Sequence, residues 1–283
     1  VGWSATAGTL RPPSTPMASD ALRSFLLAVR PLSLAAAALF LPPCAELGAA
    51  QQPRVAIVAS ADNGFSSPHY TDPQARLVAT GRFQAVDLID VMGSTPTLAQ
   101  LQAYDAVLTW SNYSYADGDA LGDRLADYVD GGGGVVVAVF GNTSTQVDRY
   151  LGGRWISGGY ELVPGRGDVV AFSPATLGAI HDPGHPTVAG VASFDGGSGS
   201  FRPYRTGLSV HGVEVASWSD GRTLVAVSTQ FHGRVDLGFV PPSAVADPAF
   251  WVPGTDGDKL LANALEFVAG SGGGPRLSVA GLV

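Results

Sequence analysis

A polar turn that follows an apolar run contains two hydroxyl side chains that could act as nucleophiles. Residues 131–146 read GGGGVVVAVFGNTSTQ, so four glycines and a six-residue apolar run precede this turn. A hydroxyl becomes a good nucleophile when a neighbouring base activates it, and the sequence identifies no such base for Thr143 or Ser144. Both residue types also favour the N-cap of a helix, which would begin near Thr145. We therefore expect caps here and predict no catalytic residue.

Two other groupings contain residue types that bind metal ions. His181 and His185 are four positions apart, a spacing that binds metal on a helix, but the Asp-Pro-Gly between them forces a turn, so only a loop site stays open. Residues 117–123 hold acids as a calcium loop does, yet Leu121 stands where an oxygen ligand is needed, and acids at a helix start suit the macrodipole. Glycines 131–134 precede a strand and lack the Gly-Lys-Ser/Thr of a phosphate loop. We predict neither a metal nor a cofactor.

Apolar runs that alternate with amphipathic segments must position these residues. The predicted strands are VAIVAS (55–60), AVDLIDV (85–91), DAVLTW (105–110) and VVVAVF (135–140). The segments between them have helical spacing, with Thr95 or Thr97 as a cap for the second helix. Buried strands that alternate with helices indicate a parallel sheet covered on both faces. The predicted fold is therefore α/β: a flavodoxin-like doubly wound parallel sheet of order 2-1-3-4.

The second half of the chain has a different pattern. Strands are predicted in EVASW (214–218), TLVAVSTQF (223–231) and RVDLGFV (234–240). Short turns join them, which is typical of antiparallel hairpins. An amphipathic helix over 256–270 closes the domain, and SGGG then opens a Gly-rich linker and tail, 271–283.

The first fifty residues have the features of a targeting sequence. From Met17, a possible start, arginines precede an apolar stretch and small residues precede Gln51, as in a secretory signal peptide. The apolar stretch is too short for a comfortable membrane span. We divide the chain into a leader and signal peptide (1–50), one domain (51–270) and the tail. The protein is expected to be exported, to the periplasm, the cell surface or the medium.

Charge and cysteine content narrow the classes of partner. The net charge is −8, and the first fifty residues carry three arginines and two acids, so residues 51–283 carry −9. An acidic chain without a basic run is not expected to bind nucleic acid or an anionic membrane surface. Cys44, the only cysteine, lies in the leader, so the mature domain would have no disulfide and no thiolate nucleophile. A neutral small molecule or glycan suits this chain better, and the oligomeric state is not indicated.

The order of these segments resembles the class I glutamine amidotransferase-like superfamily, and especially its ThuA-like (trehalose-utilisation-like) branch. The resemblance covers about residues 54–270 and is carried by VAIVAS, YDAVLTW, LADYVDGGGGVVVAVF, HPTVAGVASF, GRVDLGF and LLANALEFVAG. In the amidotransferases, the strand matched by VVVAVF leads into a sharp turn with a catalytic cysteine beside backbone N–H groups. Here that turn reads GNTS. The resemblance therefore implies this fold with a sharp turn at residues 141–144 but without glutaminase activity.

Two histidines take their expected places from the same resemblance. The family's late histidine stands in a Gln-Phe-His-Pro-Glu stretch, which this chain matches at Gln230-Phe231-His232 but not beyond. Because a strand follows, we expect His232 in a hairpin turn. His185 belongs to a His-Pro pair that, in ThuA-like chains, marks a segment beside the pocket.

The predicted topology places a ligand site outside the carboxyl ends of the strands, where the strand order reverses. The loops after the first, third and fourth strands meet there, and their amides, hydroxyls and aromatic rings suit a neutral polyhydroxylated ligand. Trp110 equally suits the core. The candidate binding residues are Asp62, Asn63, Trp110, Asn112, Tyr113, Asn142, Thr143 and, from the resemblance, His185.

Three functions remain open. The leading hypothesis is an exported, catalytically degenerate amidotransferase-like domain that binds a ligand or partner. One alternative is a ThuA-like enzyme that acts on a carbohydrate, which a base within reach of Thr143 would favour. The other is a structural module of a longer surface protein, favoured if the loops leave no pocket.

Overall fold

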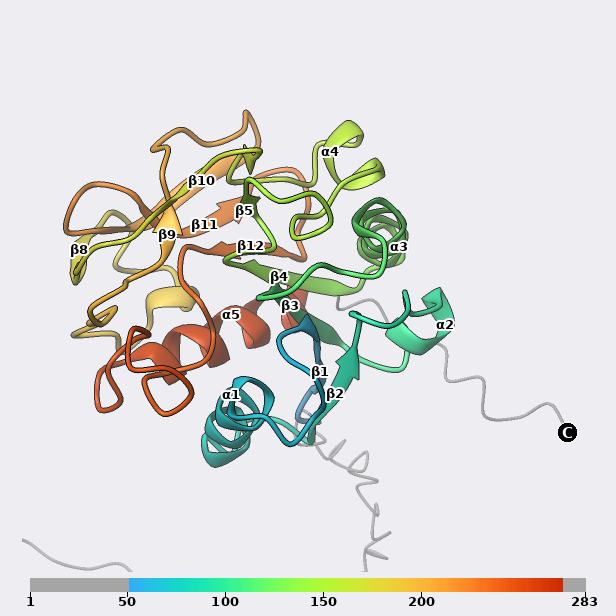
Figure 1. Cartoon of the computed structure of the whole chain (residues 1–283), viewed down its shortest axis with the longest axis horizontal. Helices are drawn as coiled ribbons and strands as arrows, with labels where there is room; N and C mark the ends of the chain where they lie inside the picture. The colour runs from blue at the N-terminus through green and yellow to red at the C-terminus, as the bar shows by residue number, and fades with distance from the viewer. Residues whose placement is uncertain (1–50, 272–283) are drawn as a thin grey trace, which may run out of the picture. The chain divides into compact units, whose positions relative to one another are not determined.

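A computed structural model describes residues 51–271, and one eight-stranded sheet runs through them (Figure 1). Its strands are β1 (Arg54–Ser60), β2 (Ala85–Asp90), β3 (Ala106–Ser111), β4 (Gly134–Ala138), β8 (Leu177–Ile180), β10 (Gly212–Trp218), β11 (Thr223–Ser228) and β12 (Arg234–Leu237). Their order is β2-β1-β3-β4-β12-β11-β10-β8. The leader predicted over 1–50, with Met17 and Cys44, and the tail from 272 onward lie outside the described residues.

The parallel half of the sheet confirms the predicted order 2-1-3-4. Strands β2, β1, β3 and β4 pair in parallel, and β3 and β4 are buried at every position. The antiparallel C-terminal hairpins are also confirmed, since β11 pairs with both β10 and β12. Two features go beyond the prediction: β12 docks in parallel against β4, and β8 adds an edge strand beside β10.

Side-chain caps and prolines set where the helices begin. The helices are α1 (Pro68–Ala79), α2 (Leu98–Leu101), α3 (Gly118–Asp130), α4 (Arg154–Ser157), α5 (Gly257–Ser271) and the 3₁₀ helix η1 (Pro186–Val188). Thr97 caps α2 in a reciprocal pair with Gln100, and Asp117 caps α3. Helix α1 begins at Pro68, because Ser67 caps it and a proline suits the first position of a helix.

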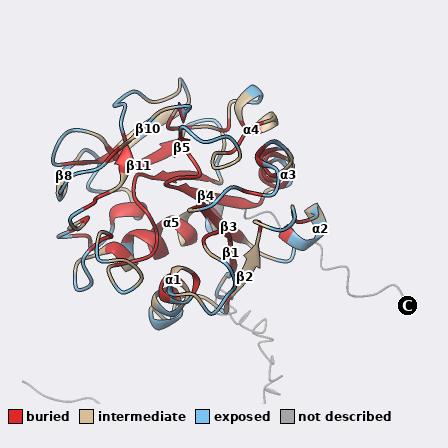
Figure 2. Ribbon diagram, viewed as in Figure 1, coloured by how far each residue is buried: buried red, intermediate tan, exposed pale blue. Residues whose placement is uncertain are grey.

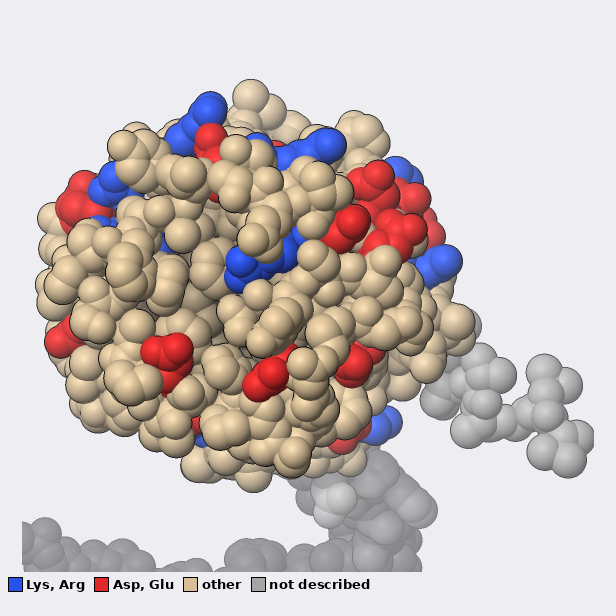
Figure 3. Space-filling model, viewed as in Figure 1, with Lys and Arg blue, Asp and Glu red and all other residues tan. Residues whose placement is uncertain are grey.

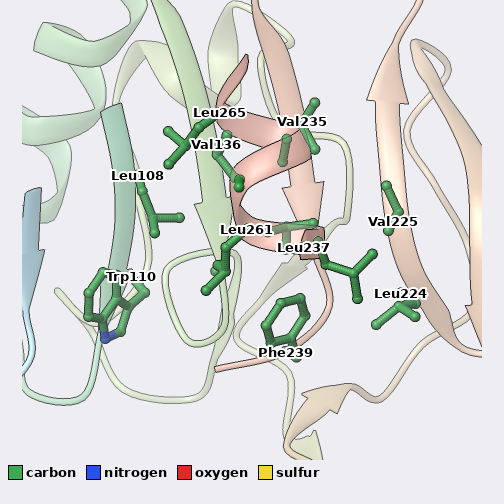
Figure 4. Packing of buried hydrophobic residues seen from close by; sticks show 14 of the residues in the cluster. Leu108, Trp110, Val136, Leu224, Val225, Val235, Leu237, Phe239, Leu261 and Leu265 are labelled. Atoms are coloured by element: carbon green, nitrogen blue, oxygen red, sulfur yellow. The ribbon is translucent and has the colours of Figure 1, made fainter. Parts of the chain in front are cut away.

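The helices cover both faces of the sheet, which is buried between them (Figures 1 and 2). On the face of α1 and α5, Leu108, Val136 and Leu237 pack with Leu261 and Leu265 (Figure 4). On the other face, apolar side chains of β1, β3 and β4 pack against α3 and α4. Within residues 51–271, no helix has the length and apolar character needed to cross a bilayer.

The expected helix after the GNTS turn is absent, so the predicted cap is wrong. Thr143–Ser144 forms a short strand, β5, that pairs with β6 (Gly165–Arg166). Two successive turns precede it, in which Gly141 N donates to Ala138 O and Thr143 N to Phe140 O. The sharp turn itself is therefore present, but it turns the chain into an extended pairing. The remaining short strands, β7 (Val170–Ala171) and β9 (Arg202–Pro203), pair with each other.

A buried ion pair joins the segment between β5 and β6 to the centre of the sheet. Arg234 and Asp236 on β12 bond to each other and have side chains 0% and 1% exposed. Arg234 also donates to Tyr160 O, and its guanidinium lies 4.6 Å from the ring centroid of Trp155. Asp236 accepts a bond from Val163 N at 2.9 Å. The network satisfies both charges, as burial in a low-dielectric interior requires.

Candidate functional site

The carboxyl ends of the parallel strands and their loops form one surface, here called the carboxyl-edge surface. It consists of the loops after β1 (61–67), β3 (112–117), β4 (139–153) and β12 (238–256). Asn112 N and Tyr113 N both donate to Ser60 O, at 2.8 and 2.9 Å, so the loop after β3 lies against the end of β1. Phe140 N donates to Ser111 O at 3.3 Å. The loops therefore meet where the topology predicts.

An aromatic layer lies at this edge of the sheet. The ring centroids of Phe140 and Phe201 are 5.5 Å apart, and those of Phe201 and Phe250 are 5.8 Å apart. The cavity that Phe201 and Phe250 line with core residues measures only about 10 Å³, the space of one water molecule at most. A ligand could therefore lie over this layer but not beneath it. Exposed rings, Phe65 and Tyr113, stand on the neighbouring loops at 45% and 44% exposure.

Asp62, Ser67 and His69 form a hydrogen-bonded cluster at the start of α1. Ser67 Oγ donates to Asp62 Oδ2 at 2.6 Å, and His69 Nδ1 lies 3.3 Å from Ser67 Oγ and 3.5 Å from Asp62 Oδ2. The bond from Ser67, with a second from Asn63 N, lowers the pKa of Asp62. The edge-on contact of the His69 ring with Phe250 joins this cluster to the aromatic layer.

The cluster has the residue types of a serine hydrolase triad but not its geometry. In a triad, the histidine takes the serine proton through Nε2 while the carboxylate holds Nδ1. Here the Ser67 hydroxyl bonds to the carboxylate itself, and both lie on the Nδ1 side of His69. Ser67 is therefore a helix cap, whereas His69 Nε2 has no hydrogen bond to another described residue and is the group able to transfer a proton.

The Thr143 hydroxyl is engaged with the backbone. Its side chain is fully buried, and Oγ1 donates to Gly165 O at 3.1 Å. Ser144 Oγ accepts a bond from Gln146 N at 3.1 Å. Neither hydroxyl bonds to a base in the described chain, so this turn lacks the activated nucleophile that an acyl-transfer enzyme needs.

Unpartnered polar atoms gather beside the same turn. Seven buried side-chain N or O atoms in residues 51–271 have no hydrogen-bond partner, and four belong to Trp110, Asn142 and Arg149. Asn142 is 5% exposed, and both atoms of its amide are unpartnered. Buried polar groups normally have partners, so such a concentration calls for an explanation at this place.

Only some of the predicted binding residues lie on the carboxyl-edge surface. Asp62, Asn63, Asn112 and Tyr113 lie on the two loops that meet at the end of β1, and Asn142 and Thr143 follow β4. Trp110 is fully buried in the core, so its ring offers no face to a ligand. Its unpartnered Nε1 lies on the side of the ring away from Leu108 (Figure 4).

His185 and His232 lie away from the carboxyl-edge surface. His185 caps η1 through Thr187, and its ring packs 4.7 Å from that of Phe267 on α5; burial there lowers its pKa. His232 stands in the turn between β11 and β12, which confirms the predicted hairpin. The neighbouring Gly233 O accepts a bond from Val135 N at the start of β4, so this turn lies at the opposite edge of the sheet.

The groupings that suggested metal chemistry have other partners. His181 Nε2 lies 3.2 Å from Glu214, whereas His185 bonds to Thr187, so the two histidines do not converge. The acids of α3 gather on one side of the molecule (Figure 3). Two of them accept bonds from the backbone of residues 153 and 154. No three His, Cys, Asp or Glu side chains within 51–271 are arranged to hold a metal ion.

A larger cavity lies at the amino-terminal edge of the sheet, away from these loops. It measures about 780 Å³ and is lined mainly by polar side chains beside the start of β1 and the end of α5, among them Gln51, Arg54, Arg82, Asp105 and Glu266. It borders both limits of the described chain. None of the predicted binding residues lines it.

The polar residues Ser67 and Arg149 belong to the carboxyl-edge surface but were not among the predicted binding residues. Ser67 has a usable signal, since Ser-Pro before an amphipathic segment marks a helix start. Arg149 has none, because its position depends on how the loop after β4 folds back.

Comparison with known proteins identifies the fold. No family model and no curated protein matches the chain. A ThuA-like protein from Bacteroides uniformis is similar over 77% of this chain and 91% of its own, with a TM-score of 0.55 and 14% identity. A cytoplasmic protein from Salmonella typhimurium is similar over 76% and 98%, with a TM-score of 0.50 and 12% identity. At such identities the likeness concerns the fold alone, which is ThuA-like.

Proposed function

We propose that residues 51–271 form a catalytically degenerate ThuA-like domain that binds a neutral polyhydroxylated small molecule or a glycan outside the cell. The observation that carries the proposal is the composition of the carboxyl-edge surface. It combines exposed aromatic rings, amide and carboxylate side chains on the loops that follow β1 and β3, and an aromatic layer. Aromatic faces with a few fixed polar groups are the usual lining of sites for small organic ligands.

The ligand would lie between the loops after β1 and β3. Tyr113 would pack against the apolar face of a sugar ring, as exposed aromatic side chains do. Asp62, held by Ser67 and Asn63 N, is an oriented acceptor for hydroxyl groups. Asn112 offers both a donor and an acceptor. These three side chains would fix the orientation of the ligand.

Two features of the turn support the proposal that the domain has no glutaminase activity. The superfamily's cysteine is replaced by the GNTS sequence, and the Thr143 hydroxyl is committed to Gly165 O. Binding without acyl transfer is therefore the activity that this surface supports best.

A second candidate is a ThuA-like enzyme that acts on a carbohydrate. One observation favours it: His69 Nδ1 lies 3.5 Å from the Asp62 carboxylate, which orients the ring and leaves Nε2 to act as a general acid or base. The third hypothesis, a structural module, requires no ligand at all.

Calorimetric titration with simple sugars and glycans separates these functions. The expected result is saturable binding that weakens in Asn112→Ala and Asp62→Asn, while Gln102→Ala, exposed at the opposite edge, binds as the wild type does. Asp62 and Asn112 are half-buried, so thermal unfolding of each variant without ligand is needed to show that lost affinity reports on the site and not on the fold. Binding that is unchanged in both loop variants would place the site elsewhere. Conversion of the bound sugar, lost in His69→Ala, would establish the enzyme instead.

A further inference from the structure

Arg149 differs from the other arginines in its surroundings. Within residues 51–271, every other buried or half-buried arginine lies within 4.0 Å of a carboxylate. Arg149 is half-buried at the carboxyl-edge surface and has no such partner in that range. The carboxylate next to it in sequence, Asp148, instead accepts a bond from Gly118 N at 3.1 Å. The positive charge of Arg149 is therefore uncompensated.

The surroundings hold the Arg149 guanidinium in place without satisfying it. Its central carbon lies 4.1 Å from the ring centroid of Phe140, so the ring supports it. Its backbone carbonyl accepts a bond from Ser111 Oγ. Nε has no partner, and one terminal nitrogen makes only a long bond of 3.4 Å to Gln146. Burial lowers the pKa of Arg149. A planar donor group with free N–H bonds remains.

Asn142 supplies a second unsatisfied group on the same loop. It lies two residues beyond Phe140, the residue that supports Arg149, and it is 95% buried with neither amide atom bonded. Leaving a buried amide unbonded costs free energy. An amide contributes one acceptor and two donors. A ligand group that satisfies Asn142 together with Arg149 would therefore combine a negative charge with a hydrogen-bond donor.

We propose that Arg149 and Asn142 recognise a carboxylate with a hydroxyl nearby, so that among polyhydroxylated ligands a sugar acid binds more tightly than a neutral sugar. This inference rests on the proposed function and names the ligand class of the same surface. A guanidinium matches the planar carboxylate, with two parallel hydrogen bonds. A single uncompensated arginine balances one negative charge, whereas a phosphate carries up to two. The Asn142 Oδ1 would accept the bond from a hydroxyl near the carboxylate.

Titrations with D-glucuronate, D-gluconate and D-glucose at matched ionic strength test this inference. The expected result is that both acids bind about 10- to 100-fold more tightly than glucose, the effect of the charge-assisted hydrogen bonds to the carboxylate. Inorganic phosphate and acetate are the accompanying probes, and both should bind more weakly than the sugar acids. Phosphate that binds as tightly as D-glucuronate would overturn the assignment of a carboxylate.

Substitutions of Arg149 and Asn142 test whether these two residues recognise the ligand. Arg149→Gln keeps most of the side-chain stem over Phe140 and should abolish the preference for acids. Arg166→Gln is the matched control, because Arg166 is exposed and also has no carboxylate within 4.0 Å in the described chain. Asn142→Ala should weaken D-gluconate binding. Thermal unfolding of each variant without ligand shows whether it folds, and the ligand-induced shift of the wild-type Tm gives a second measure of the preference.

The outcomes distinguish this inference from the proposed function. If glucose and D-glucuronate bind equally well, and Arg149→Gln changes neither, the inference is wrong while the binding function stands. If no sugar or sugar acid binds to the wild type, both are wrong. A preference for acids that persists in Arg149→Gln would also overturn the role of Arg149.

Discussion

Thr143 donates its hydroxyl hydrogen to the carbonyl oxygen of Gly165 across 3.1 Å, and both residues are buried. Their contact is so close that a Cβ atom added at Gly165 would lie 2.2 Å from Thr143 Oγ1. The Thr143 side chain therefore leaves room only for a glycine at position 165, where β5 pairs with β6. The hydroxyl that the sequence offers as a nucleophile instead helps to hold the loop after β4.

Replacement of Thr143 should affect stability and not catalysis. Thr143→Val keeps the shape of the side chain but removes the bond, which leaves a buried carbonyl with one partner fewer and costs about 1 kcal/mol. Urea unfolding measures this change, and Ser66→Ala, on an exposed loop, is the control. Neither the wild type nor Thr143→Val should release ammonia from glutamine. Ammonia release that disappears in the variant would contradict the structural role of Thr143.

Breaking the buried Arg234–Asp236 pair should cost much more stability than breaking an exposed ion pair. Asp236→Asn leaves the Arg234 charge buried without its counter-charge, and we expect a loss of about 3 kcal/mol or more in the free energy of unfolding. Asp87→Asn, which breaks the exposed pair with Arg54, should cost less than about 1 kcal/mol. Denaturant unfolding of the two variants provides the comparison. Equal losses would show that Arg234 is not isolated from solvent.

Stability should fall between about pH 4.5 and pH 7 because of Glu161. Burial, and then repulsion from Asp236, raise the pKa of Glu161 from 4.5 to about 7, against the attraction of Arg166 and Arg234. In this window the unfolded chain has lost the proton that the folded chain still holds, so unfolding becomes easier as pH rises. The contribution is fully present below pH 4.5, and its loss is complete above pH 7, at roughly 2 to 3 kcal/mol. Glu161→Gln should remove this part of the pH dependence; an unchanged profile would contradict it.

Export predicts the N-terminus of the mature protein. Protein recovered from its native host should begin near Gln51, after removal of the signal peptide. N-terminal sequencing or mass spectrometry of the soluble fraction gives the measurement. Soluble protein that retains Met17 to Ala50 intact would count against export.

The sequence predicts the parallel half of the fold because burial there depends on local pattern. Strands β1, β3 and β4 lie between two helical layers, so each must be apolar along its length, and such runs are visible in the sequence. The position of β12 between β4 and β11 is a long-range pairing that no local pattern encodes. Strand β8, with the sequence LGAI, is short and half-exposed, and it has neither a continuous apolar run nor clear alternation.

The candidate site was predictable only in part, because local sequence pattern does not encode long-range contacts. Asp62 and Asn112 follow predicted strands directly, so the topology alone brings their loops together. Arg149 reaches Phe140 through the fold of a fifteen-residue loop, 139–153, whose course depends on tertiary contacts. His185 departs from the site because its ring packs against Phe267 on α5, a contact that the resemblance did not include.

The place of β12 also determines when this domain can be completed during synthesis. Strand β12 is the last strand of the sheet to be made, yet it lies between β4 and β11. Until it emerges from the ribosome, each of those two strands has an unpaired edge, which is a template for association with other chains. About 100 residues separate β4 from β12, which at typical elongation rates corresponds to roughly 5 to 20 s of exposure. Chains released before Arg234 should therefore aggregate, whereas chains that reach Leu237 can close the sheet from within.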